Sequence, residues 1–202
     1  MRMRHTSGKA NDSGQALMET ILAMPVLLVL ALNAVNFGFF FLMALNLTGA
    51  ARNSATYSIM GGATPASISL PAAGPNTTIT SVSYLAYQDL TGAVYSPSTT
   101  AGVQVCSPSI GINNPGTTTQ NSMCSAFGSV GSFVAASTDP ELNAGSTAPA
   151  FNLNRVDVVE KFTPPIPYMP FNIVLLVNPL CVSSGGSVTC TFYRHIEMRA
   201  MN

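Results

Sequence analysis

The chain has 202 residues, of which 47% are hydrophobic and only 8% are charged. A soluble globular domain usually has about 25% charged residues, so water is not the only solvent that this protein meets. Eight basic residues balance eight acidic ones, which gives no support for binding to a nucleic-acid backbone.

The N-terminus is short and basic. Arg2, Arg4 and Lys9 precede the first long apolar run, and Asp12 is the only acidic residue among them. Basic segments next to a membrane helix tend to stay on the cytoplasmic side. We therefore expect residues 1–14 to form a leader that remains in the cytoplasm.

A long apolar run follows the leader, and Thr20–Ala51 contains no charged residue. As a helix this run would be about 48 Å long, which exceeds the roughly 30 Å of bilayer hydrocarbon. A removable signal peptide has an apolar region of only about 7–15 residues, so the length favours a retained helix. We predict a helix over 15–62 that spans the membrane at about 20–45, is kinked at Pro25 and stops at Gly61-Gly62.

Small residues recur along this helix. Ala31, Ala34 and Gly38 lie three and four residues apart, with Asn33 and Asn36 close by. Together they predict a flattened and partly polar stripe along the span, and such a stripe allows membrane helices to approach one another closely. The alternative is that small residues are simply common in membrane helices.

The sequence Ser13-Gly-Gln-Ala-Leu-Met-Glu19 places a lone carboxylate five residues after a glycine. A charge at the mouth of a membrane helix is costly. In one interpretation, Glu19 is stabilised by the helix dipole and the lipid headgroups. In the other, a peptidase cuts after Gly14, and Glu19 pairs with the freed amine of Gln15 or with that of a neighbouring subunit, which sets the register of helix packing.

The basic leader, Gly14, Glu19 and the apolar helix resemble class III type IV prepilins, and most of all the TadE-like minor pilins of the tight-adherence (Flp pilus) machinery. The segment that begins at Val156 and the closing Glu197-Met-Arg are also similar to that family. The resemblance implies cleavage by a prepilin peptidase between Gly14 and Gln15, with Glu19 as the assembly carboxylate. Thr20 departs from the family, which usually has an aromatic residue at this position.

Residues 63–202 are rich in Ser, Thr, Gly, Pro and Asn, which predicts many turns. Short β-branched runs predict an antiparallel sheet; they are Thr77–Tyr87, Val103–Cys106, Val156–Phe162 and Val188–Tyr193. The expected fold class is therefore α+β, with a long transmembrane helix followed by a small exported β-rich domain.

All four cysteines lie beyond the apolar run, where an oxidising compartment favours disulfides. Folding the segment 181–190 about Gly185-Gly186, a favoured hairpin turn, places Cys181 opposite Cys190 at a closely spaced position. Cys106 and Cys124 are then left to pair with each other. A metal site is disfavoured because there is no Cys-x-x-Cys spacing and both histidines are remote.

No catalytic motif is present, and His5 and His195 are far apart in sequence. We therefore expect no enzymatic activity, no cofactor and no small-molecule substrate. The expected role is a minor pilin or pseudopilin in the bacterial inner membrane, with its C-terminal domain in the periplasm or outside the cell. Its expected partners are other pilin subunits and the inner-membrane assembly platform. The alternatives are a single-pass anchored binding domain outside any filament and, less favoured because such subunits are usually shorter, a major pilin.

Overall fold

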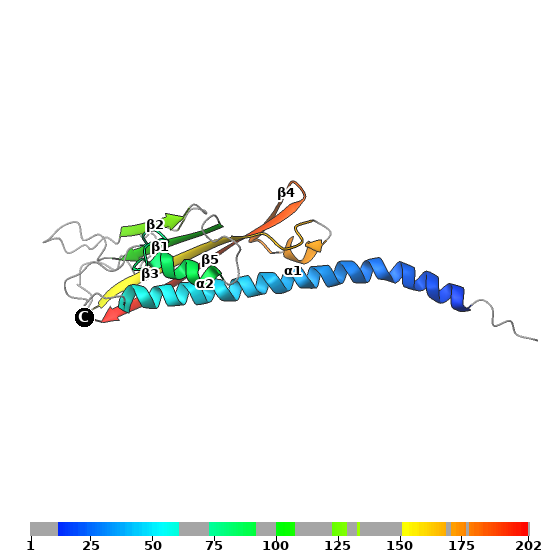
Figure 1. Cartoon of the computed structure of the whole chain (residues 1–202), viewed down its shortest axis with the longest axis horizontal. Coiled ribbons are helices and arrows are strands. Elements are labelled where there is room, and N and C mark those ends of the chain that lie inside the picture. Colours follow the sequence, from blue (N-terminus) through cyan, green and yellow to red (C-terminus); the bar gives the residue numbers. More distant parts are fainter. Residues whose placement is uncertain are drawn as a thin grey trace, which may run out of the picture.

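The computed structural model describes residues 12–60, 73–91, 100–107, 123–128, 133, 151–168, 171–176 and 178–201. Its longest element is α1 (Asp12–Met60), a helix of 49 residues that extends far beyond the sheet at its N-terminal end (Figure 1). Pro25 lies inside α1, and the blue N-terminal part of the helix is inclined to the rest in Figure 1. Leader residues 1–11 and the predicted stop at Gly61-Gly62 lie outside the described residues.

The described strands form one antiparallel sheet in the order β2-β1-β3-β5-β4. Their bounds are β1 (Ala101–Ser107), β2 (Met123–Gly128), β3 (Phe151–Phe162), β4 (Cys181–Ser184) and β5 (Ser187–Met201). The whole of β3 pairs with β5, from Phe151 opposite Met201 to Phe162 opposite Cys190. A long helix, an antiparallel sheet and two disulfides confirm the α+β class.

The core lies between the sheet and the C-terminal half of α1. Val156 and Val158 are two residues apart in β3, and Phe192 lies in the neighbouring strand β5. Each of these side chains is at most 1% exposed. They share one buried cluster with Met43 and Leu47 of α1. Side chains four apart lie on one face of a helix, and those two apart lie on one face of a strand, so each element presents a continuous apolar face to the other.

The prediction of a strand at Thr77–Tyr87 is wrong. The structure has a turn there, followed by α2 (Val82–Thr91), which packs against α1 beside the sheet. The hydroxyl oxygen of Ser81 accepts a hydrogen bond from the backbone N–H of Tyr84 at 3.1 Å and so caps the helix. The fully buried apolar side chains of α2 recur four residues apart; they are Val82, Ala86 and Leu90. This helical period outweighs the strand preference of the β-branched residues.

The other three predicted runs lie within β1, β3 and β5. The prediction missed β2, whose sequence Met-Cys-Ser-Ala-Phe-Gly contains no β-branched residue. This strand pairs with β1 over six residues, including Cys124 opposite Cys106. Its conformation is therefore set by pairing and by the disulfide, not by local preference.

The Cys181–Cys190 hairpin has the predicted register, with Ser184 opposite Ser187 next to the turn. Gly185 and Gly186 both have positive φ, 59° and 79°, a conformation that glycine adopts readily. The structure contains both expected disulfides, Cys181–Cys190 and Cys106–Cys124. The first lies in the core below the hairpin, and the second joins β1 to the edge strand β2.

Candidate functional site on the N-terminal helix

α1 consists of two halves with different surroundings. Between Gly14 and Leu32, no side chain is buried, and we call this segment the bare half of α1. From Asn33 to Ser58, one face of the helix is buried against the sheet and α2. Within the described residues, α1 is the one helix that is long and apolar enough to cross a membrane, and its bare first half is free to do so.

The predicted processing and assembly residues lie in the first turns of α1. Gly14, Gln15 and Glu19 are all exposed, and a side chain built on Gly14 would meet nothing within 4 Å. Glu19 follows Gln15 by four residues, so the two share one face of the helix. The neighbouring Thr20 donates its hydroxyl to the Ala16 carbonyl at 2.9 Å, which satisfies this polar group within the helix.

The small residues Ala31, Ala34 and Gly38 are exposed. At about 100° per residue, they lie on the side of α1 opposite to the face that packs on the sheet. Asn33 and Asn36 are 6% and 0% exposed and belong to that packed face. The expectation that these asparagines form part of the small-residue stripe is therefore wrong; the stripe is apolar and faces away from the sheet.

Asn36 connects α1 by hydrogen bonds to the segment that follows β3. Its side-chain amide donates to the carbonyls of Ile166 at 2.9 Å and Phe171 at 3.0 Å, and to the side-chain oxygen of Asn172 at 2.8 Å. Asn172 in turn donates to the carbonyls of Ile166 and Tyr168. The two buried asparagines thus hold a proline-rich loop against the helix at the point where its bare half ends.

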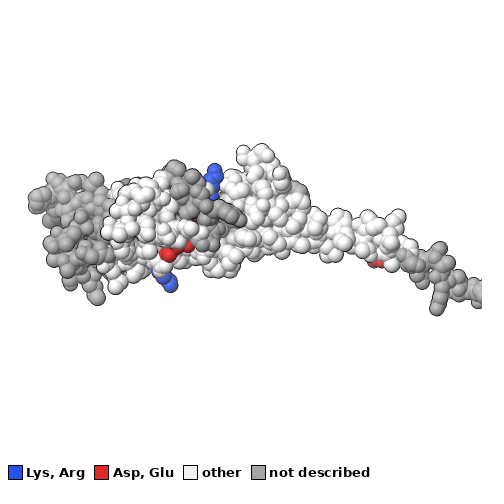
Figure 2. All heavy atoms as spheres, viewed as in Figure 1, with Lys and Arg blue, Asp and Glu red and all other residues white. Residues whose placement is uncertain are grey.

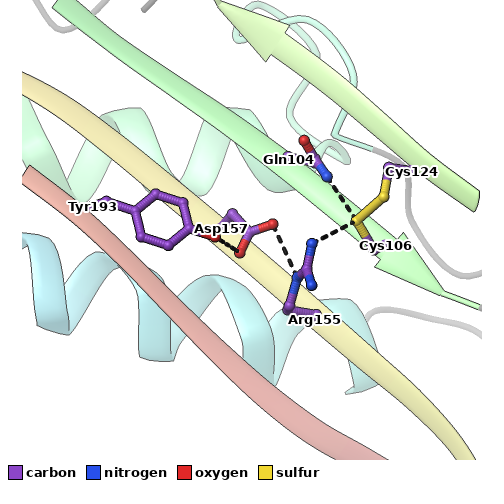
Figure 3. Close-up of a disulfide and its surroundings, with 6 residues drawn as sticks. All are labelled: Gln104, Cys106, Cys124, Arg155, Asp157 and Tyr193. Atoms are coloured by element: carbon purple, nitrogen blue, oxygen red, sulfur yellow. Dashed lines mark hydrogen bonds and ion pairs between the residues drawn. A yellow bond between two sulfur atoms is a disulfide. The ribbon is translucent and has the colours of Figure 1, made fainter. Parts of the chain in front are cut away.

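A second polar cluster lies on the face of the sheet that points away from the helices. There the guanidinium of Arg155 contacts the carboxylate of Asp157 at 3.1 Å, and the two side chains are 3% and 0% exposed. The hydroxyl of Tyr193 donates to the other carboxylate oxygen at 2.7 Å (Figure 3). Burial raises the pKa of Asp157, and the contacts with Tyr193 and Arg155 oppose this rise.

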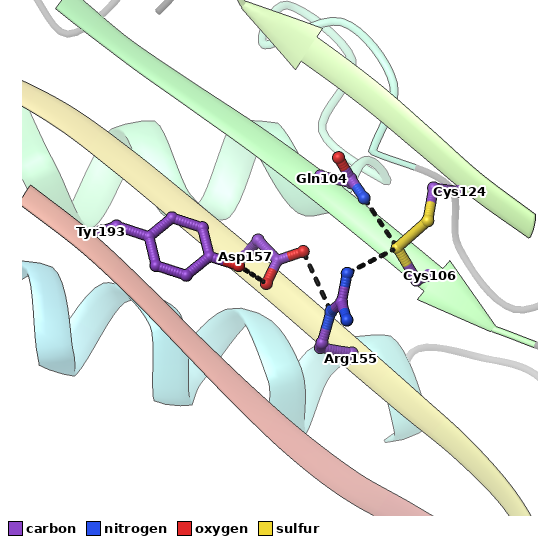
Figure 4. A network of polar contacts seen from close by, with 6 residues as sticks. All are labelled: Gln104, Cys106, Cys124, Arg155, Asp157 and Tyr193. Carbon is purple, nitrogen blue, oxygen red and sulfur yellow. Dashed lines mark hydrogen bonds and ion pairs between the residues drawn. A yellow bond between two sulfur atoms is a disulfide. The ribbon is translucent and has the colours of Figure 1, made fainter. Parts of the chain in front are cut away.

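The same cluster contacts the Cys106–Cys124 disulfide (Figure 4). The side-chain amide of Gln104 lies 2.8 Å from the sulfur of Cys106, and the guanidinium of Arg155 lies 3.6 Å from it. Weak sulfur acceptors of this kind add little energy. The contacts nevertheless connect the buried ion pair to the covalent link between β1 and β2.

Glu160 lies on the opposite, helix-facing side of β3 and is fully buried. Neither of its carboxylate oxygens has a well-formed hydrogen bond. Burial raises the pKa of Glu160 to about 7, with a partly opposing contribution from the side chain of Thr100. The pKa of nearby Tyr87 is raised to about 12 by burial and by the charge of Glu160. Glu160 is therefore a buried acid that weakens the fold when it is ionised.

We expect Glu160→Gln to remove a pH dependence of stability. Because the pKa of Glu160 in the folded state lies above its ordinary value of 4.5, the folded protein binds the proton more tightly, and its stability falls as the pH rises through about 7. The melting temperature of the full chain in detergent should therefore drop from pH 5 to pH 8 by more in the wild type than in Glu160→Gln. Asp89→Asn, at a half-buried position, is the control, and equal slopes in Glu160→Gln and the wild type would refute this role.

These clusters show what the sequence reasoning missed. Asn36 was noticed, but its partners lie 130 or more residues away, and no local pattern identifies them. Asn36 lies seven residues, or two helical turns, before the buried Met43, and this spacing could have predicted that Asn36 lies on the packed face.

Within the described residues, no three His, Cys, Asp or Glu side chains gather as a metal site requires.

Within the described residues, a helix that is bare over its first half and carries a disulfide-bonded sheet on its second half is typical of a protein anchored in a membrane by one helix. The model of the TadE-like protein family matches residues 14–56, which confirms the resemblance to TadE-like proteins over the N-terminal helix. The match begins at Gly14 and ends four residues before the end of α1. No curated protein and no solved structure matches the chain.

Proposed function

We propose that this protein is a minor pilin or pseudopilin of a tight-adherence pilus, which assembles through the bare half of α1 and supports surface attachment. The observation that carries this proposal is the division of α1, whose first half has no buried side chain and has Glu19 as its only charged residue from Gly14 on. This half lies within the segment that matches the TadE-like family. A helix that served only as a membrane anchor would need no carboxylate at this depth.

Glu19 has a partner of defined chemistry in this mechanism. Cleavage after Gly14 by a prepilin peptidase creates an amine on Gln15, and that amine neutralises the carboxylate of a neighbouring subunit. A charge in a bilayer is costly when alone, so the pair forms only when the helices reach the correct axial register. The exposure of Gly14 and the lack of contacts around it are compatible with access by a peptidase.

The stripe of Ala31, Ala34 and Gly38 provides the surface for helix packing. Because it faces away from the sheet, a second helix can approach it without meeting the domain of the same subunit. Small residues allow close approach in membranes. In an assembly, the helices would then lie inside and the disulfide-bonded domains outside. The basic leader places the N-terminus in the cytoplasm and the domain in the periplasm or outside the cell, next to the inner-membrane assembly platform.

The proposed role is structural and not enzymatic. The resemblance to TadE-like proteins over residues 14–56 supports a structural role, and the buried polar groups of the domain stabilise the fold. Arg155 and Asp157 neutralise each other, and Asn36 and Asn172 satisfy backbone carbonyls. Neither cluster presents an exposed nucleophile beside a base.

We expect Glu19→Gln to reduce the number of pili at least tenfold at unchanged abundance of the protein. The amide has nearly the same shape but cannot neutralise an amine, and breaking a buried ion pair costs about 3–5 kcal/mol per contact. Counts of filaments by electron microscopy, with immunoblots of membranes, measure both quantities. Thr20→Val is the control, because it removes a polar group at the next position and leaves the carboxylate in place.

An unchanged filament number in Glu19→Gln would instead support an anchored binding domain that never enters a filament. Mass spectrometry of the same membranes shows whether the pairing amine exists, since a processed chain begins at Gln15. A chain that keeps Met1 in cells with active peptidase would contradict the pairing mechanism. The assembly role of the helix would then rest on the small-residue stripe alone.

A further inference from the structure

Two uncharged segments of the chain come together at one end of the domain: the first is Thr20–Ala51 in α1, and the second is Thr163–Tyr193 after β3. The chain has two other long uncharged segments, Asn53–Gln88 and Leu90–Thr138. The hydrogen bonds from Asn36 to the carbonyls of Ile166 and Phe171 hold the two segments together. On the face shown in Figure 2, no charged residue lies between those over the sheet and the acidic residue near the N-terminal end of α1. The fold therefore gathers two uncharged segments at one end of the domain.

Large apolar side chains are exposed at this end. Outside α1, the described residues include five exposed large apolar side chains, and four of them belong to the second uncharged segment. We call these four the apolar foot: Tyr168 at 67% exposed, Ile173 at 57%, Leu180 at 41% and Val182 at 63%. They lie in the loop before α4 (Ile173–Leu176), in α4 itself, and at and just before β4. In Figure 1 these elements form the end of the domain nearest to the bare half of α1.

The length of the bare half places this end of the domain at a membrane surface. From Gly14 to Asn33, the first buried residue of α1, the helix rises about 28 Å at 1.5 Å per residue. The hydrocarbon core of a bilayer is roughly 30 Å thick. If the bare half fills the hydrocarbon, the span runs over about 14–33 instead of 20–45, and the domain begins directly at the outer boundary.

We propose that the apolar foot rests in the boundary between headgroups and acyl chains, so that the domain as well as the helix contacts the bilayer. Tyr168 has the amphipathic ring that is enriched at this depth, and apolar groups at such a surface enter it by about 5–10 Å. The Cys181–Cys190 disulfide fixes the hairpin that carries Val182. A second copy that packed on the small-residue stripe would not cover the foot, because the stripe lies on the opposite side of α1. The inference rests on the part of the proposed function in which α1 crosses the bilayer, and it does not require a filament.

The chain contains no tryptophan, so a single introduced tryptophan reports its own depth. We expect Val182→Trp and Ile173→Trp, in the full chain reconstituted into phosphatidylcholine vesicles, to show blue-shifted emission. Lipids brominated near the headgroup end of their acyl chains should quench both at least about twice as strongly as they quench Ile79→Trp. Ile79 is 73% exposed and lies outside the foot, and serves as the matched control. Leu28→Trp, in the outer part of the bare half, reports the insertion of α1.

The four variants distinguish the possible failures. If Leu28→Trp is quenched by lipid while both foot variants behave like Ile79→Trp, the foot does not contact the bilayer and the inference is wrong. If Leu28→Trp is also unquenched, α1 is not inserted, and both the inference and the proposed function fail. A blue shift at Val182 and Ile173 that appears without lipid quenching, and only at high protein density, would identify a second copy as the occupant and overturn the inference.

Discussion

Arg155→Met is expected to lower the free energy of unfolding by about 3–5 kcal/mol at pH 8, the usual cost of leaving one partner of a buried ion pair alone. Asp157 is fully buried and contacts the guanidinium at 3.1 Å. Without Arg155, its charge keeps only the hydrogen bond from Tyr193 among the contacts described above. Urea unfolding of the full chain in detergent, with the disulfides intact, measures the change.

The effect of Arg155→Met should depend on pH in a defined direction. Burial already raises the pKa of Asp157, and loss of the guanidinium raises it further. Protonation of Asp157 removes the unpaired charge, so the destabilisation should become smaller as the pH falls below 8. The double variant Arg155→Met with Asp157→Leu should recover most of the loss, because no buried charge is left unpaired. A double variant as unstable as the single one would show that packing, and not charge, is the cause.

Asn36→Leu is expected to destabilise the protein by about 2–4 kcal/mol. Leucine has nearly the same size, but it leaves the carbonyl of Phe171 and the side-chain oxygen of Asn172 without the amide that they accept from. Each buried group that loses its partner costs about 1–3 kcal/mol. Thermal unfolding of the full chain in detergent, followed by circular dichroism, gives the overall loss.

The damage from Asn36→Leu should be local before it is global. Hydrogen exchange should accelerate first at Ile166, Phe171 and Asn172, which Asn36 contacts, and later in the pairing of β3 with β5. Asn46→Leu makes the same chemical change on an exposed face of the same helix and should alter neither quantity by a measurable amount. Uniform acceleration across the sheet in Asn36→Leu would show that Asn36 supports the whole domain and not only the segment around Ile166 and Phe171.

The two proposals for α1 assign different faces to different partners. In these proposals, another helix packs on the small-residue stripe, which faces away from the sheet, whereas the end of the domain next to the bare half contacts lipid through the apolar foot. Asn36 lies between them, at the level where the bare half of the helix ends. In these proposals, the height of the domain above the bilayer is therefore set by a pair of buried asparagines.

The sequence by itself determined the features that depend on neighbours in the chain. An uncharged run from Thr20 to Ala51 needs no distant partner to form a helix in lipid, because that helix satisfies its own backbone. The hairpin from Cys181 to Cys190 follows from two glycines that accept positive φ and from a two-residue period on either side. The end of β3 also depends only on neighbours in the chain, because Pro164 and Pro165 have no backbone N–H to donate to a sheet.

Only the tertiary structure decided the features that depend on distant contacts. Val82–Thr91 has residues that suit a strand, yet it is a helix because burying Val82, Ala86 and Leu90 together requires the period of a helix. The short edge strand β2 exists because β1 lies beside it. Asn36 holds the domain against α1 because its hydrogen-bond partners come from a loop 130 or more residues away in sequence. The energy of a buried hydrogen bond depends on what surrounds it, and that is a property of the folded chain and not of any segment alone.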